Sequence, residues 1–139
     1  MRIERLLRFF PALLVLLAPG CDRGVVVYPV KGKVVYADGT AIPGGMIEFE
    51  SVDHQPKVNA RGRINPDGTF MMGTFAVDDG AVAGKQRVIV IPPMRDEKAK
   101  VATPLAVDLR FANYARSGLE VMVEPKENDL TITVAPPKT

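Results

Sequence analysis

The chain has 139 residues, one cysteine, no tryptophan and a formal net charge of +2. Residues 1–20 hold three of the 18 Lys and Arg residues and one of the 16 Asp and Glu residues, so residues 21–139 carry 15 of each and are formally neutral. Residues 21–139 therefore lack the basic excess expected of a nucleic-acid-binding protein. A single cysteine excludes an intrachain disulfide. The length fits one domain.

The N-terminal residues change character in the order that is typical of a secretory signal peptide. Arg2, Arg5 and Arg8 give a basic start, an apolar run covers residues 9–18, and Gly20 is small. The run is about half of the ~20 apolar residues that span a bilayer. We therefore predict a cleaved signal peptide at residues 1–20 rather than an uncleaved membrane anchor.

Cys21 follows Gly20 directly, and this junction resembles the lipoprotein signal of bacteria. The resemblance implies that Cys21 is diacylated and becomes the new N-terminus. Pro19 departs from the usual pattern, and ordinary secretion with a free thiol is the alternative. We predict a lipidated cysteine and short tether at residues 21–28, and a cell-envelope location, periplasmic or surface-exposed, with the membrane bound through the lipid on Cys21.

Apolar residues then alternate with polar ones at the period of half-buried β-strands. The alternating sets are Val30, Gly32, Val34 and Tyr36; Ile47 and Phe49; Phe70 and Met72; Leu119, Val121 and Val123; and Leu130, Ile132 and Val134. In residues 88–91 four apolar residues run together, which is typical of a strand covered on both faces. We expect this to be the central core strand.

Turn signals separate these runs. Aspartate precedes glycine at Asp38, Asp67 and Asp79, a combination that favours tight turns. Many short strands with no helical periodicity predict an all-β fold. We predict a seven- or eight-stranded antiparallel β-sandwich at residues 29–135, followed by a C-terminal tail at residues 136–139.

Residues 92–113 do not fit a strand pattern and are predicted to form an exposed loop. Its end brings together Arg110, Phe111 and Tyr114. An arginine beside aromatic side chains is common at recognition sites, so these three are the candidate binding residues. The alternative is that both rings plug one end of the sandwich.

The order of these pieces resembles a transthyretin-like, or carboxypeptidase regulatory-like, domain. The resemblance is carried by residues 29–45 followed by Ile47 and Phe49, by residues 66–70 and 79–85, and by the closing residues 117–119 and 128–132. It is a resemblance to small lipoproteins of planctomycete-type bacteria, and it implies a prealbumin-like Greek-key sandwich without enzymatic activity. Similar domains contact partners or act as stalk spacers.

Few residues of the chain could form a catalytic site or a metal site. His54 is the only histidine and the only serines are Ser51 and Ser117, so no nucleophile and base stand together in the sequence. Asp78 and Asp79, with Asp53, are the only candidate calcium ligands, and their spacing favours a turn instead. We predict no catalytic residues, no metal and no cofactor.

The sequence therefore predicts a non-enzymatic, lipid-anchored envelope protein whose sandwich is a binding or interaction module. The partner would be an envelope protein or polysaccharide. The alternative is a structural spacer or stalk domain without a specific ligand.

Overall fold

A computed structural model describes residues 24–94, 98 and 106–138. Nine strands lie in this part of the chain: β1 (Val27–Tyr28), β2 (Val30–Tyr36), β3 (Met46–Ser51), β4 (Asn59–Arg63), β5 (Thr69–Met71), β6 (Ala81–Val82), β7 (Gly84–Ile91), β8 (Leu119–Val123) and β9 (Asn128–Val134). A 3₁₀ helix η1 (Leu109–Ala112) and a short helix α1 (Tyr114–Ser117) precede β8. The fold is the all-β sandwich that the sequence predicts.

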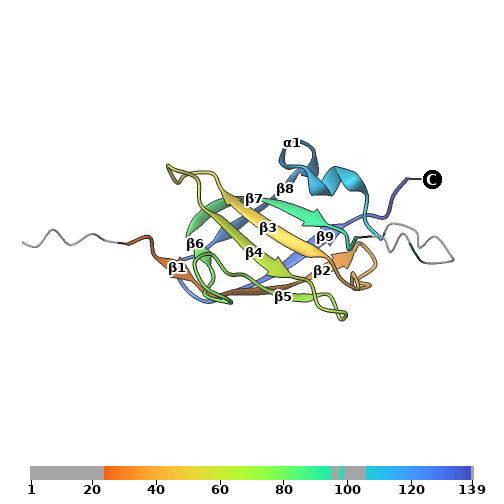
Figure 1. The fold of residues 1–139 in the computed structure, drawn as a ribbon, viewed down its shortest axis with the longest axis horizontal. Helices are drawn as coiled ribbons and strands as arrows, with labels where there is room; N and C mark the ends of the chain where they lie inside the picture. Colours follow the sequence, from red (N-terminus) through yellow and green to blue (C-terminus); the bar gives the residue numbers. More distant parts are fainter. Residues whose placement is uncertain (1–23, 95–97, 99–105, 139) are drawn as a thin grey trace, which may run out of the picture.

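The strands form two main sheets and one small one. The larger sheet has the order β4-β3-β7-β8, the second has the order β5-β2-β9, and β1 pairs with β6. Side chains from both main sheets merge into one buried cluster, in which Phe49 of β3 meets Phe70 of β5 edge to face with 6.4 Å between ring centroids. In Figure 1 the β1–β6 pair lies at the end of the sandwich where the described chain begins.

The period-two pattern of the sequence matches the burial of the strands. Val30, Gly32 and Val34 are buried while Lys31 and Lys33 are exposed, and residues 47 and 49 are fully buried. Alternate side chains of a strand point to opposite faces of a sheet, so one face of each strand lines the core. The alternation in these segments is confirmed.

Strand β7 is central, as the apolar run predicts, because it pairs with β3 on one side and β8 on the other. Val88 and Val90 point into the core, and Ile89 on the opposite face is also buried. The helical segment η1–α1 packs against β7 and lies above β7 and β8 in Figure 1. It covers the outer face of this strand near Ile89, whereas Ile91 on the same face is 37% exposed, so the strand is buried on both faces only at residues 88–90.

Three features differ from the predicted architecture. Strand β9 runs parallel to β2, with Val30 opposite Asn128 and Tyr36 opposite Val134. A parallel pair needs a long connection, and here residues 37–127 supply it. The first strand begins at Val27, inside the predicted tether, and helical turns form at residues 109–117, which the strand and turn patterns did not predict.

Gly32 lies on β2, the middle strand of the second sheet, where the neighbouring strands β5 and β9 leave no room for a side chain. A Cβ atom at this position would overlap the carbonyl oxygen of Leu130 and would lie 2.7 Å from Cζ of Phe70. Neither obstacle moves easily, because one is backbone of the neighbouring strand and the other is a buried ring.

We predict that Gly32→Ala lowers the free energy of unfolding by about 1–3 kcal/mol, since overpacking a closed core has costs of that size. Urea unfolding followed by circular dichroism measures the change. Gly24→Ala is the matched control, because a Cβ atom there has open space. Equal stability of the two variants would contradict the close packing at Gly32.

Candidate functional site

The structure places two of the candidate binding residues on η1 and the third at the start of α1. Phe111 is 4% exposed and belongs to the core cluster, and the guanidinium of Arg110 stands 4.5 Å from the centroid of its ring. Phe111 therefore contributes to the packing of the core. Cys21 and the predicted signal peptide lie outside the described residues.

Tyr114 is half-buried and joins a polar cluster on the outer face of the larger sheet. Its hydroxyl donates to Oε1 of Glu48 at 2.9 Å, and the guanidinium of Arg87 lies 5.4 Å from its ring centroid. Burial, and after it the hydrogen bond to Glu48, raises the pKa of Tyr114 well above its ordinary value. Arg110, Phe111 and Tyr114 are thus brought together, but neither ring forms part of an open aromatic patch, and a binding role for these three stays a prediction.

Exposed apolar side chains lie around Met46, Ile91 and Met94, and also on residues 73–80 between β5 and β6, which we call the apolar loop. Phe75 is 65% exposed and Val77 is 90% exposed. Met71 at the end of β5 is also half exposed beside them in the same groove. Large apolar side chains that face water together on one surface often mark an interaction site.

The apolar loop is held by one carboxylate. Asp79 accepts hydrogen bonds from three consecutive backbone N–H groups: Thr74 at 2.6 Å, Phe75 at 3.1 Å and Ala76 at 2.9 Å. The backbone bond from Thr74 is the largest cause that lowers the pKa of Asp79 below its ordinary value. Such charge-assisted bonds are short and strong, so Phe75 stands on a pre-organised backbone and Val77 follows directly after it.

Both ends of the apolar loop are tied to the sheets. Gly73 and Arg61 of β4 exchange two backbone hydrogen bonds of 2.8 Å, the N–H of Gly80 donates to the carbonyl of Met72, and the hydroxyl of Thr74 donates to the carbonyl of Gly80. These bonds close the loop on itself and on the larger sheet.

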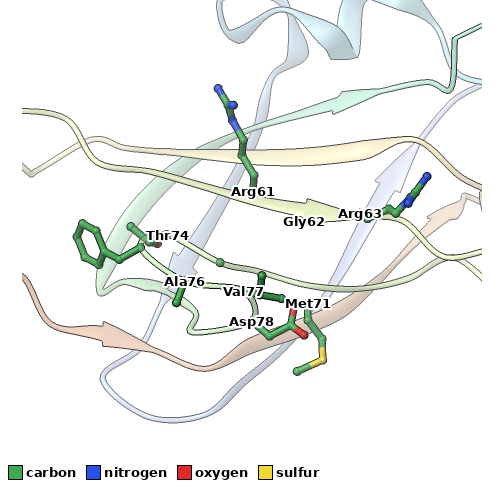
Figure 2. Close-up of a pocket in the computed structure, with 10 residues that line it drawn as sticks. Arg61, Gly62, Arg63, Met71, Thr74, Ala76, Val77 and Asp78 are labelled. Carbon is green, nitrogen blue, oxygen red and sulfur yellow. The ribbon is translucent and has the colours of Figure 1, made fainter.

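An open groove of about 470 Å³ runs between the apolar loop, β4 and the end of β5. Figure 2 shows that the side chains of Arg61 and Arg63 extend away from Ala76, Val77 and Asp78. The guanidinium of Arg61 instead meets Oε2 of Glu48 at 2.7 Å. The groove therefore lacks a converging set of charged groups on the loop side, and its chemistry is mainly apolar.

The apolar loop lies where the described chain begins. Strand β6 follows it directly and pairs with β1, with Val27 opposite Val82. A Cβ atom at Gly80 would overlap the carbonyl oxygen of Tyr28, so the two backbones touch. Residues 25 and 26, both valine and just before β1, are 43% and 61% exposed. Two segments far apart in the sequence, the apolar loop and the start of the described chain, thus lie at one end of the sandwich (Figure 1). Both segments carry exposed apolar side chains.

The acidic residues considered for calcium do not form a cation site. Asp79 uses both carboxylate oxygens on backbone N–H groups, as a turn-forming aspartate does. Asp78, with φ of 58°, is exposed. Within the described ranges, no three His, Cys, Asp or Glu side chains group closely enough to hold a metal ion.

The comparisons with known proteins give no family. No family model matches the chain, and no curated protein matches it. Among solved structures the chain is similar to a 9R-lipoxygenase from Cyanothece PCC8801, with 12% identity and a TM-score of 0.41, over 76% of this chain and 16% of that one. In the part of the chain that the structure describes, no helix is long and apolar enough to cross a membrane.

We predict that Asp79→Ala releases the apolar loop without unfolding the sandwich. Hydrogen exchange measured by NMR should show loss of protection at the amides of Thr74, Phe75 and Ala76, while the amides of β3 and β7 stay protected.

The unchanged protein should show a pH dependence of the same protection. The apolar loop is fully ordered above the ordinary aspartate pKa of about 3.9. Its order is lost as the pH falls through the lower folded pKa, because the protonated carboxyl is a weaker acceptor.

Asp78→Asn is the control for this experiment, because the three amides bond to the carboxylate of Asp79 and asparagine tolerates the positive φ of position 78. Protection that is unchanged in Asp79→Ala would show that the carboxylate does not organise the loop.

Proposed function

We propose that this chain is a non-enzymatic, lipid-anchored cell-envelope protein whose β-sandwich is an interaction module and whose contact surface is the apolar loop. The observation that carries the proposal is the exposure of Phe75, on a backbone fixed by Asp79, and of Val77 directly after that backbone. Ordering a flexible segment opposes binding, and a pre-organised one avoids that cost. The lipid on Cys21 is supported by the signal-like residues before it, and the transthyretin-like resemblance is compatible with the all-β sandwich.

A structural spacer is the second candidate, and one observation favours it. Phe111 is buried and the hydroxyl of Tyr114 is bonded to Glu48, so neither of the two rings predicted to bind a partner is fully open to solvent. A spacer needs a stable sandwich and no ligand surface. The two functions therefore differ in what the apolar loop contacts in the cell.

The anchoring part has a direct test. Metabolic labelling with a palmitate analogue should mark the unchanged protein and fail to mark Cys21→Ser, since the sulfur is the site of acylation in the proposal. Cys21 is the only cysteine in the chain, so no other thiol can take the label. An unlabelled wild-type protein would leave secretion with a free thiol as the better description.

The contact surface is tested by a photoreactive diazirine residue introduced at position 75 in the cell. We expect covalent adducts with lipid or protein of the envelope at this position. The matched control is position 109, because Leu109 on η1 is 58% exposed, close to the 65% of Phe75. A spacer would give adducts at neither position, and equal adducts at both would indicate random contact.

A further inference from the structure

We infer that the apolar loop docks on the lipid bilayer, so that Phe75 and Val77 enter the interface of the membrane that holds the anchor. The inference rests on the proposed lipidation of Cys21 and names the partner of the same surface. The observation behind it is the position of the exposed apolar side chains, which lie close to the start of the described chain.

The first step is reach. Cys21 precedes Val27 by six residues, and an extended chain covers at most about 3.5 Å per residue. A lipid on Cys21 therefore holds β1 within roughly 20 Å of the bilayer surface. Because β1 pairs with β6 and Tyr28 touches Gly80, the apolar loop lies at this membrane-proximal end.

The second step is the chemistry of that end. Phe75 and Val77 on the apolar loop, and Val25 and Val26 just before β1, are all exposed and uncharged. Apolar side chains on a membrane-facing surface are buried at the boundary between head groups and acyl chains, typically ~5–10 Å deep. An aromatic ring such as Phe75 suits that boundary.

The third step is the rigidity of the loop. The carboxylate of Asp79 fixes the backbone of Thr74, Phe75 and Ala76 before any contact. The loop therefore meets the bilayer in one conformation, and its insertion would set the orientation of the sandwich relative to the membrane. A lipid anchor alone would leave that orientation free.

The absence of tryptophan from the chain allows a clean test. Phe75→Trp is expressed from the full sequence in a bacterial host, purified in the form that the host produces, and reconstituted into phosphatidylcholine–phosphatidylglycerol vesicles that carry brominated acyl chains. We expect blue-shifted emission and quenching at least about twofold stronger than in the control Leu109→Trp, since bromine quenches only a ring that lies among the acyl chains. Val77→Trp, at a position that is 90% exposed, repeats the test if Phe75→Trp does not fold.

The outcomes separate the two proposals. Protein that fails to float with the vesicles overturns lipid anchoring. If the protein floats but the indole at position 75 or 77 is as water-exposed and unquenched as the indole at position 109, lipid anchoring stands. Bilayer docking is then overturned. That second result would direct the search to a protein or polysaccharide partner.

Discussion

The structure depends on the contact between its two main sheets, because no disulfide joins them. Phe49 from the larger sheet and Phe70 from the second sheet are fully buried and pack edge to face, an arrangement that contributes beyond the area it buries. Gly32 leaves room for the ring of Phe70. Just beyond Phe70 the buried Met72 accepts the N–H of Gly80. The core therefore also fixes where the apolar loop leaves the sandwich.

Much of the fold was predictable because strand periodicity reports burial directly. The alternation in β2, β3 and β9 and the apolar run in β7 each follow from which faces are covered. The parallel pairing of β2 with β9 was not predictable, because it depends on how residues 37–127 are arranged between them. The short helices carry only capping signals, such as Asn113, which accepts from the N–H of Ala115, and Gly118 in the left-handed region.

The candidate site was less predictable, and Phe75 shows why. Apolar residues in a glycine-containing segment near strands look like core, and exposure depends on the loop that Asp79 builds. The aspartate before Gly80 predicted a turn correctly. This turn holds two apolar side chains away from the core because three backbone N–H groups bond to one carboxylate. No residue pattern in the sequence predicts that arrangement.

Two aromatic residues of this chain have opposite placements. Phe111 has a neighbouring arginine and looks like a recognition residue in the sequence, yet its ring fills the core and Arg110 covers it from outside. Phe75 has no such neighbour and faces water from a rigid loop beside β1. A lipid on Cys21, six residues before β1, would keep this end of the sandwich near its membrane. Unburied apolar side chains at that end would then be stabilised by the bilayer rather than tolerated in water.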